Sequence, residues 1–195
     1  MKTWKVMDIK DETAFIEAIS SLDQEALEAV FEEYAPILYK YLLRLGQGPQ
    51  EADQIVGDVF VRLLEKLSEG KGPRKNLRSY LFQTAYHLVV DHSRDRKRAA
   101  PLEVAEIEPV KRETQSVQAQ TEEALLLETL SAAIDDVLTE EQRVVIVLRF
   151  QEGFSLKETA DIIDKKVNAV KALQNRAMSR LREALTNDES EDQDA

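Results

Sequence analysis

Basic and amide side chains gather near the C-terminal end of the chain, in the segment ADIIDKKVNAVKALQNRAMSRLR (160–182). At about 100° per residue, a helix beginning at Val167 would place several of them on one face. That face consists of Asn168, Lys171, Asn175, Arg176, Ser179 and Arg182. Lysine, arginine and serine side chains bind phosphates, and asparagine, arginine and lysine bind base edges in a major groove. By composition alone, a solvated surface helix fits the pattern equally well.

The residues around this face favour DNA binding. The opposite face is narrow and apolar, formed by Val170, Leu173, Ala177, Leu181 and Leu185. A short helical segment, SLKETADII, precedes it, with Ser155 and Glu158 spaced as a capping box and with its end at Asp164. Two helices joined by a tight turn, the second longer and basic, are typical of a helix-turn-helix.

A second basic segment lies earlier in the chain. Residues 74–98 contain seven basic and two acidic residues, a net charge of +5, although the whole chain carries −11. Residues 143–182 likewise carry +5, from nine basic and four acidic residues. Tyr80, Phe82 and Tyr86 lie within the first segment, and aromatic rings beside cations can stack on single-stranded bases. Aromatic residues at helical spacing are more often core, and we expect this of Phe82.

One pair of residues allows an enzyme as an alternative. His87 and Asp91 share a helix face at a spacing of four, which can hold a metal ion. The chain has two histidines and no cysteine, and it lacks a glycine-rich phosphate loop and a Ser-His-Asp order. We therefore expect no catalytic residue, no metal and no cofactor.

Apolar spacing is helical along most of the chain. We expect a helix over 27–45, kinked or split at Pro36, and a second that begins near Pro49 and reaches Leu67. A third covers 77–98. In the C-terminal part, Thr139 and Gln142 have capping-box spacing, and Gly153 is a stop signal. No run approaches the roughly 20 apolar residues that span a bilayer, so we expect a cytoplasmic protein without membrane insertion.

The residues between these helices predict the domain organisation. The segment 99–121 has two prolines, no aromatic residue and a net acidic charge, which is typical of a flexible linker. The expected fold class is all-α, with two small helical domains at 1–98 and 122–187. The residues 188–195 form an acidic tail that we expect to be disordered.

Five segments together resemble a known family. They are FEEYAPILYKYLLRL, EADQIVGDVFVRLLEKL, LRSYLFQTAYHLVVDHSRDRKR, LTEEQRVVIVLRFQEGFSLKETADII and VKALQNRAMSRL. In this order, with a linker in between, they resemble bacterial RNA polymerase sigma factors of the extracytoplasmic-function (ECF) group, which keep only a region-two and a region-four domain. The resemblance covers about residues 22–98 and 122–186.

The resemblance implies a role for each domain. Residues on the second helix would dock on the clamp helices of the polymerase large subunit: Asp53, Gln54, Ile55, Asp58 and Val59. The first basic segment would melt the minus-ten promoter element and capture an extruded base, through Arg74, Lys75, Asn76, Arg78, Tyr80, His87, Asp91, Arg94, Arg96, Lys97 and Arg98. The last helix would read the minus-thirty-five element, through Lys165, Lys166, Asn168, Lys171, Ala172, Asn175, Arg176 and Ser179.

The chain departs from the family pattern at the turn before the last helix. Asp164 stands where the turn usually has glycine, and Lys166 stands where a serine usually caps the helix. We therefore expect Asn168 or the turn backbone to cap this helix, and Lys165 and Lys166 to contact phosphate.

The resemblance implies core RNA polymerase and promoter DNA as partners. Such factors are often held by an anti-sigma factor, although these residues do not identify one. Two alternatives remain open: a helix-turn-helix regulator that does not replace the specificity subunit of polymerase, and a helical adaptor that uses its acidic linker.

Overall fold

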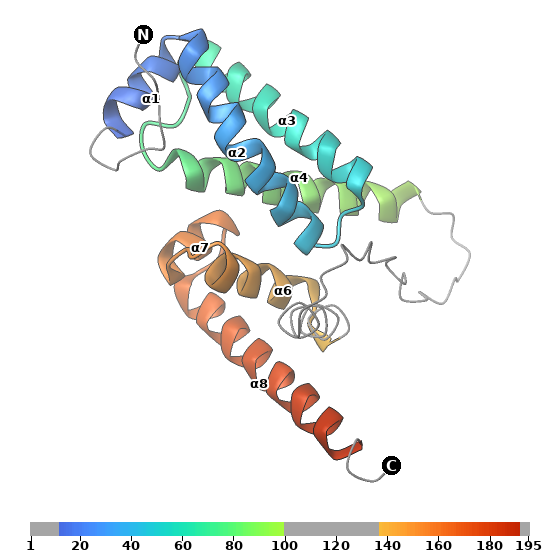
Figure 1. Cartoon of the computed structure of the whole chain (residues 1–195). Helices are drawn as coiled ribbons and strands as arrows, with labels where there is room; N and C mark the ends of the chain where they lie inside the picture. Colours follow the sequence, from blue (N-terminus) through green and yellow to red (C-terminus); the bar gives the residue numbers. More distant parts are fainter. Residues whose placement is uncertain (1–11, 100–136, 192–195) are drawn as a thin grey trace, which may run out of the picture. The chain divides into compact units, whose positions relative to one another are not determined.

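The computed structural model describes residues 12–99 and 137–191, and within these ranges every regular element is a helix (Figure 1). The chain divides into two compact units, which we call domain one and domain two. The expected all-α fold with two helical domains is therefore confirmed. Most of the predicted linker, from residue 100 on, and the expected start of domain two lie outside the described residues.

Domain one contains helices α1 (Glu12–Ser20), α2 (Gln24–Arg44), α3 (Pro49–Ser68) and α4 (Leu77–Ala99). Helix α3 packs against both α2 and α4, and α1 packs against α2 and α3. Each long helix contributes its apolar stripe to one core, whose fully buried side chains include Leu38, Tyr41, Leu42, Ile55, Leu63, Leu81 and Phe82. Helical periodicity of apolar residues thus produces a bundle with one shared interior.

The helix starts in domain one have local causes. The Asp23 carboxylate accepts a hydrogen bond from the Ala26 backbone N–H at 2.9 Å, which satisfies a free donor in the first turn of α2. Pro49 is in the first turn of α3, as predicted, where a missing N–H costs nothing. Gly70 follows α3 with a φ of 69°, a conformation that glycine adopts without strain.

Of the two outcomes predicted for Pro36, a kink or a split, the split is wrong, because α2 runs without a break from Gln24 to Arg44. Pro36 and Glu32 are both exposed. Because proline has no N–H, the Glu32 carbonyl lacks the hydrogen bond that it would usually accept from residue 36. Water can bind that carbonyl, so the missing hydrogen bond leaves no buried polar group unsatisfied.

Domain two contains helix α6 (Glu140–Ile146), a π-helical turn η2 (Val147–Gln151), α7 (Leu156–Ile162) and α8 (Val167–Glu191). Both predicted capping boxes are present. Thr139 and Gln142 exchange side-chain and backbone hydrogen bonds at the start of α6, and Ser155 and Glu158 do so at the start of α7. Gly153 separates η2 from α7 with a φ of 72°.

Helix α8 packs mainly against α6. Leu138, Ile146, Ala177 and Leu181 form one buried cluster, and Val137 packs on its edge. The helix continues to Glu191, so the prediction that the acidic tail is disordered is wrong for residues 188–191, and residues 192–195 lie outside the described residues.

Candidate nucleic-acid and polymerase interfaces

The basic face of α8 is exposed as the helical period predicts. Val170 and Ala177 are fully buried and Leu181 is nearly so, whereas Leu173 is half-buried. The opposite residues are all exposed: Asn168, Lys171, Asn175, Arg176, Ser179 and Arg182. We call these six exposed residues the DNA face. Ala172 is half-buried beside it.

The turn before α8 has an unusual backbone. Asp164 adopts a φ of 51°, the left-handed conformation in which the family's usual glycine is favourable. Aspartate is among the residues that tolerate this conformation best, which explains why the turn survives the replacement. The Lys166 carbonyl then accepts from the backbone N–H groups of Ala169 at 2.8 Å and Val170 at 3.1 Å, so the first turn of α8 closes on the backbone of Lys166.

Two basic residues of this segment lie against α6 instead of joining the DNA face. The Lys165 ammonium is 2.8 Å from a carboxylate oxygen of Glu141. The Arg180 guanidinium donates to the Val137 carbonyl at 3.4 Å and to the Gln142 side-chain oxygen at 3.3 Å. The expected phosphate contact of Lys165 therefore competes with an ion pair inside domain two.

Arg149 has a positioning role that the sequence pattern did not reveal. Its guanidinium donates to the Gln174 side-chain oxygen at 3.1 Å and to the Phe154 carbonyl. Gln174 precedes Asn175 of the DNA face, so Arg149 links η2 and the following loop to the middle of α8. The only sequence signal for this contact was a basic residue within an otherwise apolar run.

In domain one, the loop before α4 presents three of the predicted minus-ten residues. Arg74, Lys75 and Asn76 are exposed, and Asn76 has a φ of 53°. The Asn76 carbonyl accepts from the Tyr80 N–H at 3.1 Å. The carboxylate of Glu12, in α1, accepts from the Leu77 N–H at 3.3 Å, so a distant acid satisfies a donor in the first turn of α4.

The aromatic residues of α4 have different surroundings. Phe82 is 0% exposed, and its ring lies 4.8 Å from that of Tyr41, so the prediction that Phe82 belongs to the core is confirmed. The Arg78 guanidinium, half-buried, lies 5.2 Å from the Phe82 ring centroid. Tyr80 and Tyr86 are half-buried, and burial raises the pKa of the Tyr80 phenol above its ordinary value, which keeps it a neutral hydrogen-bonding group.

The remaining minus-ten candidates lie toward the end of α4. His87, Asp91 and Arg94 are exposed, and the Arg94 guanidinium is 3.9 Å from the Asp91 carboxylate. Arg96, Lys97 and Arg98 belong to the same helix, but their side chains lie outside the described set.

Burial separates the five polymerase-binding candidates of α3. Asp53 and Gln54 are exposed and Asp58 is half-buried. Ile55 and Val59 are both 0% exposed and belong to the core between the helices. A direct contact through these two side chains would require the bundle to open, and both instead anchor α3 in the core.

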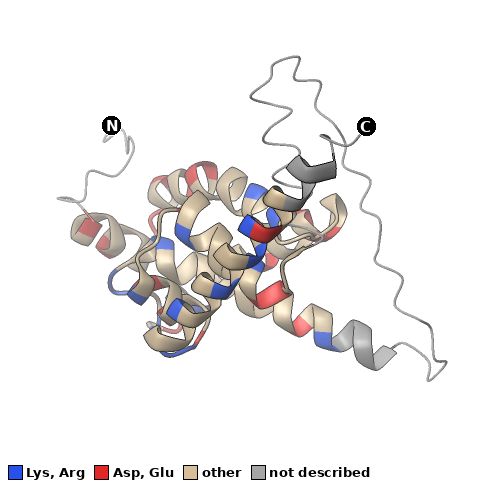
Figure 2. Ribbon diagram, turned by 90° about the horizontal axis from the view of Figure 1, so that it is seen from below, with Lys and Arg blue, Asp and Glu red and all other residues tan. Residues whose placement is uncertain are grey.

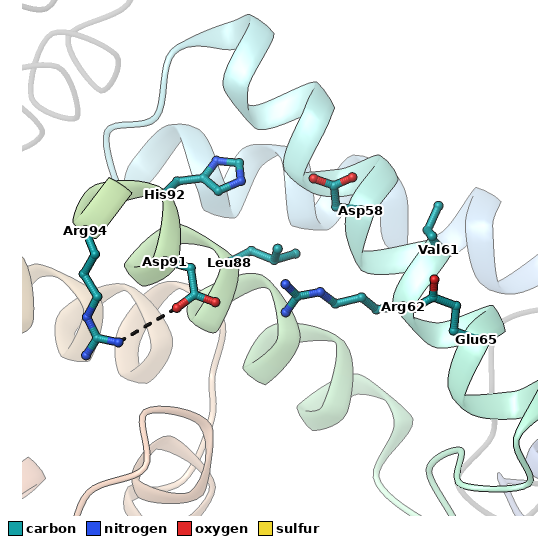
Figure 3. A pocket seen from close by; sticks show the side chains of 8 residues that line it. All are labelled: Asp58, Val61, Arg62, Glu65, Leu88, Asp91, His92 and Arg94. Atoms are coloured by element: carbon teal, nitrogen blue, oxygen red, sulfur yellow. Dashed lines mark ion pairs between the residues drawn. The ribbon is translucent and has the colours of Figure 1, made fainter. Parts of the chain in front are cut away.

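A groove between α3 and α4 brings two predicted sites together (Figure 3). Its volume is about 590 Å³, and it is lined by Asp58, Val61, Arg62, Glu65, Leu88, Asp91, His92 and Arg94. Asp58 is a predicted polymerase contact, whereas Asp91 and Arg94 are predicted minus-ten residues. Across the groove's end, His92 Nδ1 lies 3.8 Å from a Glu51 carboxylate oxygen.

The side chains that line this groove carry charges of both signs, with Arg62 and Arg94 beside Asp58, Glu65 and Asp91. In the residues that the structure describes, no group of three or more His, Cys, Asp or Glu side chains could hold a metal ion. Over the same ranges, none of the helices is both long enough and apolar enough to cross a membrane. Lys and Arg positions (blue) and Asp and Glu positions (red) both occur on the helices of the described residues (Figure 2).

Comparison with known proteins identifies the family. Residues 30–99 match the model of Sigma-70 region 2, and residues 136–183 match that of Sigma-70, region 4. The chain is 30% identical to the ECF RNA polymerase sigma factor SigD of Mycobacterium tuberculosis (strain ATCC 25618 / H37Rv), over 84% of this chain and 78% of SigD. It is 26% identical to the ECF RNA polymerase sigma factor BldN of Streptomyces coelicolor, over 89% of this chain but only 65% of the length of BldN.

A solved structure confirms the fold. The sigma factor RpoE of Bartonella quintana, in a co-crystal with the anti-sigma factor NepR, matches with a TM-score of 0.61 and 22% identity, over 82% of this chain and 96% of that one. The helices, the two matched regions and the curated relatives agree on one class of protein, the sigma factors of RNA polymerase. Within that class the chain belongs to the ECF group, and like the rest of the family it is a transcription initiation factor and not an enzyme.

Proposed function

We propose that helix α8 reads the minus-thirty-five promoter element in the major groove. The observation that carries this proposal is the DNA face, on which amide, hydroxyl and cationic side chains are all exposed opposite a buried apolar stripe. Lys171, Asn175 and Arg176 reach base edges, and Lys166 and Ser179 bind phosphates. Ala172 sits between them, where a methyl group can contact a thymine methyl.

Domain one acts on the minus-ten element. Arg74, Lys75 and Asn76 approach the backbone of the opened strand, and Tyr80 and His87 lie along α4 where an extruded base can stack or hydrogen-bond. Arg78 supports this surface through its contact with Phe82. Asp91, Arg94, Arg96, Lys97 and Arg98 extend it toward the end of α4.

Polymerase docking uses the exposed side of α3. Asp53, Gln54 and Asp58 present acidic and amide groups to the clamp helices, while Ile55 and Val59 anchor the helix from inside. The proposed role implies a cytoplasmic location, with core RNA polymerase and promoter DNA as partners. The similarity to RpoE, which was crystallised with an anti-sigma factor, supports an anti-sigma partner for this chain as well.

In vitro transcription tests the proposal directly. Core polymerase with the full chain is expected to select a subset of templates from a promoter library. Arg176→Ala and Lys171→Ala should each weaken recognition of the upstream element by about 1–3 kcal/mol, or roughly 5- to 150-fold, because each removes a contact to a base edge.

The matched control is Lys40→Ala, which removes an exposed positive charge from α2, outside the predicted sites. This variant should transcribe like wild type. Unchanged template selection by both Arg176→Ala and Lys171→Ala would overturn the role of α8. A chain that binds duplex DNA tightly alone and never joins core polymerase would instead indicate a separate helix-turn-helix regulator.

A further inference from the structure

Lys165 is held by an acid from a distant part of domain two. It lies in the turn between α7 and α8, and its ammonium is 2.8 Å from a carboxylate oxygen of Glu141, in the first turn of α6. The two residues are 24 positions apart in the chain. Their contact therefore depends on the packing of the domain and not on local helix geometry.

This pairing changes what Lys165 can contribute to DNA binding. A free lysine gains affinity by binding a phosphate and releasing condensed counterions. Lys165 would first have to leave Glu141, and the carboxylate would then remain close to the DNA backbone. Both effects oppose a phosphate contact at this position.

The neighbouring cations are placed differently. Lys166, Lys171 and Arg176 are exposed, and within the described residues none of them has an ion-pair partner. The Glu141 carboxylate thus neutralises Lys165 and none of these three cations, and Lys165 lies at the edge of the DNA face where the turn meets α8.

We propose that Glu141 withholds Lys165 from the DNA backbone and so lowers sequence-independent binding, which makes Glu141 a specificity-determining residue of domain two. This inference rests on the proposed function, in which α8 faces a duplex. Phosphate contacts carry no sequence information, so removing one favours promoter sequence over bulk DNA. The Lys165 and Glu141 side chains are 31% and 56% exposed, so replacing Glu141 leaves no buried charge and should leave the fold intact.

The test uses the full-length protein and a labelled random-sequence duplex, with binding followed by fluorescence anisotropy over a range of salt concentrations. Glu141→Gln should bind the duplex more tightly than wild type. One added phosphate contact should steepen the log–log salt dependence by about 0.9, so its advantage should shrink about threefold between about 50 and about 200 mM salt.

Two further variants locate the effect. Glu140→Gln removes the same charge one residue earlier, where no contact with Lys165 is present in the structure, and should leave the salt slope unchanged. Lys165→Gln should have little effect alone but should abolish the gain of Glu141→Gln in the double variant.

Three results would overturn the inference: no gain in Glu141→Gln at the lowest salt, a gain that persists in the double variant, or a shallower slope in Lys165→Gln alone. The first means that the pair does not limit binding, the second that Glu141 acts by itself, and the third that Lys165 already contacts phosphate. The transcription assay on Arg176→Ala tests the proposed function separately. If that variant loses template selection while Glu141→Gln changes nothing, only the role of Glu141 fails.

Discussion

At the scale of single residues, burial decides which side chains of a helix can take part in binding. Phe82 and Phe31 illustrate the difference, because both are phenylalanines of the same bundle at helical spacing. Phe82 is 0% exposed and packs on Tyr41, whereas Phe31 is 51% exposed, although its ring centroid lies 4.8 Å from that of Phe60. Only the three-dimensional packing separates them.

A substitution pair tests this assignment. Phe82→Ala should lower the free energy of unfolding by about 3–5 kcal/mol, because it leaves a cavity in a close-packed core. Phe31→Ala, the matched control, should cost on the order of 1 kcal/mol, since its ring is largely solvated. Urea unfolding followed by circular dichroism measures both, and equal losses would contradict the assignment of Phe82 to the core.

The same distinction applies to the site residues. Helical periodicity correctly predicted which residues of α8 would be exposed, because 3.6 residues per turn is a local property of the backbone. It did not predict that Lys165 and Arg180 would turn toward α6, because their partners Glu141 and Gln142 lie far away in the chain. The family resemblance, in contrast, grouped Ile55 and Val59 with Asp58, since it assigns whole segments and not side-chain directions.

At the scale of helices, local sequence signals predicted where the helices begin better than where they are interrupted. The capping boxes at Thr139 and Ser155 formed as predicted, because each is completed within four residues. Pro36 does not split α2, since the packing of α2 on its neighbours outweighs the cost of one missing hydrogen bond.

Replacing the two prolines should therefore have opposite consequences. Pro36→Ala restores an N–H that can bond to the Glu32 carbonyl within the intact α2. The substitution should raise the free energy of unfolding by about 1–3 kcal/mol. Part of this gain is offset because alanine gives the unfolded chain more conformational entropy than proline does. Pro49→Ala, in the first turn of α3, should be neutral or slightly destabilising. Thermal unfolding of both variants decides the matter, and a destabilised Pro36→Ala would show that the proline has a structural function.

At the scale of the whole molecule, charge is distributed to suit two different partners. The chain carries −11 overall, yet two segments of +5 lie within it. Under the proposed function, the acidic residues of α3 would favour a protein partner, and the acidic background would limit non-specific attraction to DNA. The Glu141–Lys165 pair would serve the same purpose on a local scale.

Removing two acidic residues of α3 tests whether this helix binds core polymerase. Asp53→Asn/Asp58→Asn should weaken binding to core polymerase about tenfold, mainly through slower association, while the circular dichroism spectrum stays that of wild type. Glu17→Gln/Glu33→Gln removes the same charge from exposed positions of α1 and α2 and should bind normally. Equal affinities of the two double variants, measured by titration of labelled protein with core polymerase, would refute docking through Asp53 and Asp58.

The amino-acid sequence by itself determined the helical class, the two-domain order, the capped helix starts and the family, because these depend on spacing along the chain. The tertiary structure decided that Lys165 pairs with Glu141, that Arg180 contacts Gln142, and that Asp58 shares a groove with Asp91 and Arg94. These features depend on contacts between residues far apart in the chain, and such contacts form only when the helices pack.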